Sequence, residues 1–160
     1  MKLAERLYRL LVRLTSALQF PFLLAVRLYW GWQFIETGWG HLTHLDRVSG
    51  YFGELGIPLH MPMSFAISLL EFFGGMLLAL GLASRLTALL LTCTMLVAFF
   101  AADRAALFSI FSDPDKFYAA APFPFLGASL LVLIFGPGRY SADSVIAPRF
   151  EARATGSRAG

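Results

Sequence analysis

Charged residues are scarce in this chain of 160 residues. Asp, Glu, Lys and Arg make up 14% of it and hydrophobic residues 58%, whereas an ordinary soluble domain has about 25% charged and about 45–50% apolar residues. So few charged side chains could hardly form the water-facing surface of a small soluble domain. The composition therefore predicts a protein embedded in a membrane, and the length favours a single domain.

Cysteine is nearly absent as well. Cys93 is the single cysteine, so this chain cannot close an intrachain disulfide, form a Cys-x-x-Cys redox pair or build a thiolate metal site by itself. The sequence also lacks a phosphate-binding loop, a Gly-x-Ser-x-Gly motif and a His-Glu-x-x-His motif. These absences argue against a hydrolase of the soluble type.

Four long hydrophobic runs are present. A membrane-spanning helix needs roughly 20 mostly apolar residues, because the hydrocarbon core is about 30 Å thick and a helix rises about 1.5 Å per residue. The runs are Pro21 to Leu42, Pro62 to Leu82, Arg85 to Ala102 and Ala119 to Gly136. Because backbone groups in lipid must be hydrogen-bonded within their own segment, we predict an all-α fold. It is a four-helix transmembrane bundle with an N-terminal amphipathic helix and short interfacial helices in the outer loops.

The chain divides into three predicted parts. Residues 1–18 form a basic amphipathic helix suited to the surface of anionic lipids. Its basic side chains, spaced three or four residues apart among leucines, are Lys2, Arg6, Arg9 and Arg13. Residues 19–140 form the four-span domain. Residues 141–160 are a polar cytoplasmic tail that we expect to be disordered, above all from about Arg149 onward.

Positive charge is distributed unevenly between the two sides of the predicted bundle. With four spans both termini lie on one side of the membrane. That side carries nine Lys or Arg and three Asp or Glu, whereas the other side carries three Lys or Arg and five Asp or Glu. The positive-inside rule then predicts a multi-pass inner-membrane protein with both termini in the cytoplasm. Since the basic residues are juxtamembrane or lipid-facing, we expect no nucleic-acid partner.

Three charged residues fall at membrane depth, namely Arg27, Glu36 and Glu71. Each costs about 2.5–3.5 kcal/mol at a helix centre, so we expect all three to face the bundle interior and to find partners. Arg85, in the short turn after the second run, is expected to anchor the cytoplasmic end of the bundle.

Two helix faces are expected to pack together. One face of the first span consists of Arg27, Gly31, Phe34, Gly38 and His41, and one of the second span of Ser64, Ser68, Glu71 and Gly75. Small residues such as Gly74 and Gly75 let a neighbouring backbone approach closely. We therefore predict contact between Arg27 and Glu71. The pair either fixes helix register or forms part of a polar site for proton, quinone or ligand chemistry.

The histidines suggest a site at the outer end. His41 and His44 are three residues apart, and Glu36 lies two turns before His44, so a metal ion or a quinone head is geometrically feasible there. Histidines at a membrane interface are often hydrated and have this spacing without binding a ligand. We therefore predict no metal site. The candidate ligand or quinone pocket thus comprises Arg27, Glu36, His41, His44 and Glu71.

Several ordered motifs resemble the DoxX family of small four-span membrane proteins, over roughly residues 20 to 145. They are Arg27 ahead of Gly31, Thr37-Gly38-Trp39-Gly40-His41-Leu42, Leu55-Gly56-Ile57-Pro58, Glu71 to Arg85 with Gly74, Gly75 and Gly81, and Phe135-Gly136-Pro137-Gly138-Arg139. The family often has lysine where this chain has His41, so a titratable group replaces a fixed charge.

The resemblance implies a membrane subunit of a redox system, since the family includes a small subunit associated with thiosulfate:quinone oxidoreduction. Our leading hypothesis is an accessory subunit of a quinone-linked or thiol/sulfur-related oxidoreductase, with quinone as the implied cofactor. Its expected partners are the lipid bilayer and a membrane or peripheral protein, and homo-oligomerisation stays open. A non-catalytic scaffold or assembly factor is the alternative. A small transporter is a third alternative. The sequence argues against it, because it shows no inverted repeat of the kind found in many transporters.

Overall fold

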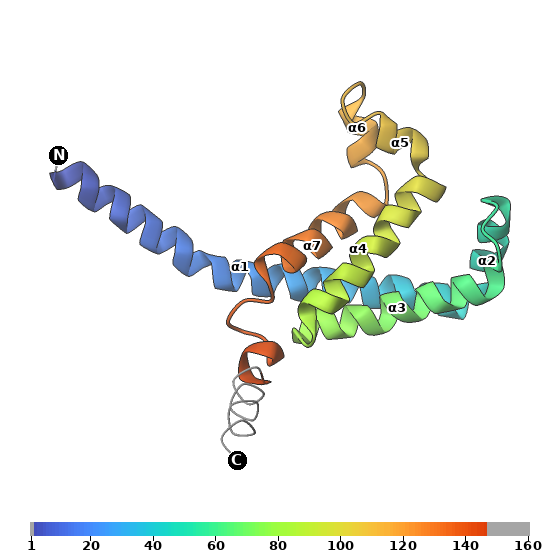
Figure 1. Cartoon of the computed structure of the whole chain (residues 1–160), viewed down its shortest axis with the longest axis horizontal. Coiled ribbons are helices and arrows are strands. Elements are labelled where there is room, and N and C mark those ends of the chain that lie inside the picture. The colour runs from blue at the N-terminus through green and yellow to red at the C-terminus, as the bar shows by residue number, and fades with distance from the viewer. Residues whose placement is uncertain (1, 147–160) are drawn as a thin grey trace, which may run out of the picture.

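The computed structural model describes residues 2–146, and this part of the chain contains helices and no strands (Figure 1). The all-α prediction is therefore confirmed. The helices are α1 (Lys2–Thr43), α2 (Leu45–Glu54), α3 (His60–Leu80), α4 (Ser84–Ala101), α5 (Arg104–Phe108), α6 (Pro114–Tyr118) and α7 (Pro122–Phe135). The disorder expected in the last part of the tail concerns residues outside the described ones.

The predicted spans correspond to three long helices and one shorter one. α1, α3 and α4 are long and apolar enough to cross a membrane. α7 is also apolar but has only 14 residues, which at about 1.5 Å per residue makes it about 21 Å long. Pro122 stands at its start, and Gly136, with φ of 77°, ends it. The expected fourth span therefore exists as a helix shorter than the hydrocarbon core.

The first helix is longer than the predicted span. α1 runs without interruption from Lys2 to Thr43, with Pro21 inside it. The boundary predicted between residues 18 and 19 is thus not a break in the helix. The N-terminal part of α1 extends away from the other helices (Figure 1), and the side chains from Leu3 to Phe22 are all exposed. Its placement on a lipid surface stays a prediction.

Both loops that were predicted to lie on the outer side contain short helices, as expected. α2 occupies the first loop, and α5 and α6 occupy the second. Asp113 caps the start of α6, because its carboxylate accepts a hydrogen bond from the backbone N–H of Lys116. Pro114 occupies the first turn of the helix.

α1 and α3 pack with their backbones in close approach, and the faces that meet are the ones predicted. A Cβ added to Gly75 would lie 2.6 Å from the carbonyl oxygen of Gly31, and one added to Gly38 would lie 2.9 Å from the carbonyl oxygen of Ser68. Only glycine permits so small a separation. Gly74 instead faces α4, where an added Cβ would lie 3.1 Å from Leu91.

α4 and α7 complete the bundle. The main core lies where these helices meet α1 and α3, and its buried members are Phe34, Leu78, Ala88, Leu91, Met95 and Val132. A second cluster lies under α5 and α6, where the rings of Phe99 and Phe117 stack with centroids 5.3 Å apart. We call the end of the bundle that contains the α3–α4 turn the Arg27 end, and the opposite end the His41 end.

Candidate functional site

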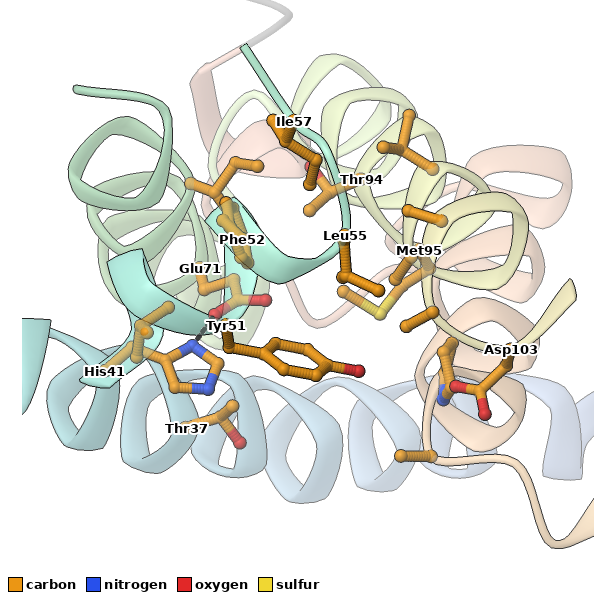
Figure 2. Close-up of a pocket in the computed structure, with 18 of the residues that line it drawn as sticks. Thr37, His41, Tyr51, Phe52, Leu55, Ile57, Glu71, Thr94, Met95 and Asp103 are labelled. Carbon is orange, nitrogen blue, oxygen red and sulfur yellow. Dashed lines mark hydrogen bonds and ion pairs between the residues drawn. The ribbon is translucent and has the colours of Figure 1, made fainter. Parts of the chain in front are cut away.

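A cavity of about 570 Å³ lies near the His41 end (Figure 2). Its walls come from α1, α2, α3, α4 and the start of α7, and most of the lining side chains are apolar. The polar or charged lining residues are Thr37, His41, Arg47, Tyr51, Glu71, Thr94 and Asp103. A few polar groups in an apolar cavity of this size are typical of small-molecule sites, whose volumes run from about 300 to 1,000 Å³.

The polar centre of the cavity is a pair formed by His41 and Glu71. The Nδ1 atom of His41 lies 2.8 Å from Oε2 of Glu71, and the two side chains are 38% and 6% exposed. A hydrogen bond to a carboxylate orients an imidazole ring and fixes which nitrogen is engaged. A ligand in the cavity would therefore meet the other ring nitrogen, Nε2.

α2 forms one wall of the cavity, with Tyr51, Phe52 and Leu55 turned into it (Figure 2). The hydroxyl of Ser49, on the buried side of α2, lies 2.8 Å from Nδ1 of His60 at the start of α3. This contact joins the middle of α2 to the start of α3. The chain returns from α2 to α3 through Gly56, whose φ of 72° is easily adopted only by glycine.

The predicted contact between Arg27 and Glu71 is wrong. The close approach of Gly38 to Ser68 and of Gly31 to Gly75 places Glu71 level with about residue 37 of α1. Arg27 is ten positions away, or about 15 Å along the helix. His41 lies only four positions away in the other direction, so the imidazole reaches the carboxylate and the guanidinium does not.

Arg27 is instead the centre of a separate network at the Arg27 end. Its guanidinium donates hydrogen bonds to the carbonyl oxygens of Pro137 and Tyr140, the latter at 2.7 Å, and is 1% exposed. The segment after α7 thus wraps around this side chain. An added Cβ on Gly81 would lie 2.6 Å from Nη1 of Arg27, so the α3–α4 turn also closes on the guanidinium.

Asp143 fastens the same segment to α4. Its carboxylate accepts hydrogen bonds from the backbone N–H groups of Ala83 at 2.7 Å and Ser84 at 2.8 Å, at the first turn of α4. Partial burial pushes the pKa of Asp143 upward. The hydrogen bonds from Ser84 and Ala83 and the charge of Arg27 outweigh that effect and hold the pKa below its usual 3.8.

Glu36 and His44 do not join the cavity. Glu36 is exposed, so the expectation that it faces the bundle interior is wrong. It stands on the side of α1 opposite Gly38 and the other residues that pack against α3. His44 is also exposed, and its Nδ1 lies 3.0 Å from the carbonyl oxygen of Gly40. Of the five pocket residues predicted, the structure brings together His41 and Glu71.

Arg85 is exposed beside Gly136, and its role as an anchor stays a prediction. Within residues 2–146, no three His, Cys, Asp or Glu side chains gather as metal ligands.

Sequence reasoning missed the polar cavity residues outside α1 and α3. Tyr51 and Asp103 belong to loop elements whose three-dimensional position no local pattern encodes. Asp143 was assigned to the tail, yet it caps α4 from 59 residues away. The Gly-Pro-Gly run at 136–138 was a usable signal, because it predicts a tight reversal that returns the chain to the bundle.

Comparison with known proteins identifies two similarities. The sequence model of the family described as DoxX matches residues 22–104. The chain is also 32% identical, over 115 residues, to a protein named "Inner membrane protein YqjF" from Escherichia coli (strain K12), which covers 71% of this chain and 82% of that protein. No solved structure matches the chain significantly. Both His41 and Glu71 lie inside the region that the family matches.

Proposed function

Because this chain belongs to the DoxX family of integral membrane proteins, we propose that it is a ligand-binding accessory subunit of a quinone-linked or thiol/sulfur-related oxidoreductase system. It lies in the inner membrane as a multi-pass protein with both termini in the cytoplasm. The resemblance to an inner-membrane protein of E. coli and the asymmetric distribution of Lys and Arg support this placement.

The observation that carries the proposal is the His41–Glu71 pair in the wall of a mostly apolar cavity. Glu71 sits on α3 nine residues from the helix end at Leu80, about 14 Å along the axis and so near the middle of the span. An ionisable pair at that depth is costly and marks a functional site by default. Mostly apolar walls with a few polar groups suit a molecule with a hydrophobic body and a polar head.

A quinone fits these residues. Its ring and isoprenoid tail would contact apolar lining residues such as Phe52, Met95 and Phe125, and a carbonyl oxygen would accept a hydrogen bond from His41 or Tyr51. A bound quinone supplies two-electron redox chemistry. The chain's own residues hold the head group, exclude water from it and keep a proton at the His41–Glu71 pair. Electrons come from a partner protein, because the single cysteine provides no dithiol.

The test is binding of a short-tailed benzoquinone to purified protein in mild detergent, followed by native mass spectrometry and titration. Wild type should bind it, and Glu71→Gln should weaken binding at least tenfold, because the amide no longer gives His41 the charged hydrogen-bond partner that orients its ring. Glu54→Gln is the matched control, since Glu54 is exposed on α2 and does not line the cavity. Equal binding by all three proteins, or bulk phospholipid alone in each, would contradict the proposal.

A non-catalytic scaffold is the second candidate, and the Arg27 network favours it. Each hydrogen bond of Arg27 goes to a backbone carbonyl, so this intramembrane charge holds the fold together. If the His41–Glu71 pair has the same purpose, replacing both residues by leucine should preserve function, because a buried pair can often be exchanged for apolar packing. Loss of cellular function with the helical content unchanged would exclude this alternative.

A further inference from the structure

The cavity fills a widening gap between α3 and α4. These helices touch near the turn that joins them, where an added Cβ on Gly74 of α3 would lie 3.1 Å from Leu91 of α4. Ile67 and Ala98 lie seven residues further from the turn and so on the same sides of their helices, yet both line the cavity. Figure 1 shows α4 running away from α3 beyond the turn. The two helices therefore form a wedge that is wide at the His41 end.

The wide end of this wedge opens on the lipid-facing surface. Val97 lines the cavity and is 54% exposed, on the same side of α4 as the exposed residues Leu90 and Cys93. On the side of α3 that faces α4, Met63 lies one turn beyond Ile67 and is 41% exposed. A residue that belongs both to the cavity wall and to the outer surface of a span stands at an opening. Val97 therefore marks the rim of this opening.

The opening lies within the membrane-spanning length of α4. Val97 is six residues, or about 9 Å, beyond Leu91, and four residues, or about 6 Å, before the helix ends at Ala101. The whole helix has 18 residues and is about 27 Å long, slightly shorter than the hydrocarbon core of about 30 Å. The opening therefore faces the acyl chains of the leaflet at the His41 end.

The cavity becomes less polar toward this opening. His41 and Glu71 form the polar pair in its wall, and Figure 2 shows Thr94 on the far side of the cavity from His41. The lining residues near the opening are mostly apolar, namely Ile57, Ile67, Thr94 and Val97. The other charged lining residues, Arg47 on α2 and Asp103 just after α4, lie where the spans end. The lateral opening thus offers apolar contacts, and the polar groups lie elsewhere in the cavity.

We propose that the opening between α3 and α4 is a lateral portal for the hydrocarbon chain of the ligand, whose head group lies at the His41–Glu71 pair. This inference rests on the proposed function and specifies its ligand as an amphiphile dissolved in the bilayer, with a compact polar head and one long chain. A cavity of about 570 Å³ holds a ligand of drug size. A longer chain has to leave the cavity, and through this portal it enters lipid without exposing apolar surface to water.

The competing route is the aqueous end of the cavity, past Arg47 and Asp103. A ligand that enters there is water-soluble, because a long chain on that side would be exposed to water. The two routes place the end of a chain at different residues. A chain in the portal ends near Val97, whereas a chain in the aqueous route ends near Asp103.

The first experiment locates the chain by photolabelling. The probe is a benzoquinone whose decyl chain carries a diazirine at its end, added to the full-length protein in phospholipid nanodiscs. After irradiation, mass spectrometry of the digested protein identifies the labelled residues. Labels should fall on the rim, at Ile57, Met63, Ile67 or Val97. An excess of a short-tailed benzoquinone should reduce these labels at least fivefold, because both molecules need the same head-group site.

A second experiment tests passage of the chain past the rim. Val97→Trp places a large side chain at the opening and should weaken binding of decyl benzoquinone at least tenfold. Binding of the short-tailed benzoquinone should change less than threefold, because its head does not reach the rim. Leu90→Trp is the matched control, since Leu90 is 44% exposed on the same side of α4 and does not line the cavity. This control should bind both molecules like wild type.

The possible failures are distinguishable. If the short-tailed benzoquinone binds and depends on Glu71, but the decyl probe labels Asp103 and Arg47 instead of the rim, the proposed function stands and the portal is wrong. A Val97→Trp effect that is no greater for the decyl chain than for the short one would also overturn the portal. If wild type binds neither molecule, the proposed function and the portal are wrong together.

Discussion

Arg27 donates a hydrogen bond at 2.7 Å to the carbonyl oxygen of Tyr140, which lies 113 residues further along the chain. The same guanidinium reaches the carbonyl oxygens of Pro137 and, at 3.5 Å, Ala79. One arginine therefore joins the first span, the end of α3 and the segment after α7. Its rigid fork of donors can satisfy several carbonyl groups at once.

Replacing Arg27 should destabilise the bundle. Arg27→Met removes the charged donor of the hydrogen bonds to the carbonyl groups of Pro137 and Tyr140, at a cost of about 1–3 kcal/mol for each. Arg27→Lys should recover only part of the loss, because an ammonium group cannot donate in the same planar fork. The measurement is the thermal unfolding midpoint in detergent. The control is Arg9→Lys, on the exposed surface beside Glu5, and an Arg27→Met protein as stable as this control would contradict the expectation.

Asp143 should contribute stability in a pH-dependent way. Asp143→Asn weakens the cap at the start of α4 and should cost about 1 kcal/mol at neutral pH. Because hydrogen bonds hold the pKa of Asp143 below its usual 3.8 in the folded protein, the carboxylate stabilises the fold fully above that value. The contribution is lost as the pH falls further through the folded pKa. Unfolding midpoints of wild type and Asp143→Asn should therefore converge below about pH 3.8.

A control for this prediction is Asp46→Asn. Asp46 is exposed on α2 and takes no part in the cap of α4. Its replacement should shift the midpoint little at any pH. A difference between wild type and Asp143→Asn that persists undiminished at acid pH would show that the cap does not depend on the ionised carboxylate.

Gly38 and Gly40 should respond oppositely to alanine. An added Cβ on Gly38 meets the backbone of Phe72 and Ser68, whereas one on Gly40 meets nothing within 4 Å. Gly38→Ala should force α1 and α3 apart and cost about 1–3 kcal/mol. Gly40→Ala should be neutral or stabilising by up to about 1 kcal/mol, because alanine is the better helix former. Equal unfolding midpoints for the two variants would contradict the close packing of α1 on α3.

The packing faces of α1 and α3 were predictable because helical periodicity is local. Residues seven apart, such as Gly31 and Gly38, share a face whatever the rest of the fold does. Periodicity does not determine the axial register of two helices, and register decides which polar groups meet. The sequence therefore identified Arg27 and Glu71 as members of the facing surfaces but paired them wrongly. The actual partners are His41 for Glu71 and backbone carbonyls for Arg27.

The misplacement of Glu36 has a different cause. The rule that intramembrane charges face the interior describes complete assemblies, and a single chain need not obey it on every surface. Helical periodicity places Glu36, nine residues after Arg27, on the opposite side of α1, so the same pattern contained the contradiction. At Glu36 the energetic rule and the helical geometry conflict, and the structure follows the geometry. The cavity lining from α2 and from Asp103 was beyond local patterns, because loop elements are placed by tertiary contacts.

Ser49 should hold α2 over the cavity. Its hydroxyl lies 2.8 Å from Nδ1 of His60 and is buried, so Ser49→Ala leaves the imidazole without this partner. We expect local opening of α2 to become about 5- to 10-fold more frequent, which corresponds to about 1 kcal/mol for one hydrogen bond. Hydrogen exchange of backbone amides in residues 45–54 measures this. Ser112→Ala, in an exposed turn, is the control and should leave exchange in α2 unchanged.

Filling the cavity should abolish ligand binding without touching the His41–Glu71 pair. Ala98 lines the cavity from α4, and a tryptophan side chain at this position adds roughly 100 Å³ of bulk or more by ordinary residue volumes. Ala98→Trp should therefore weaken binding of a short-tailed benzoquinone at least tenfold, because the ligand and the indole compete for one space. Leu96→Trp changes the same helix on its exposed side and should bind like wild type. If both tryptophan variants bind equally well, the ligand lies outside this cavity, and the polar pair must then act on something other than a molecule held there.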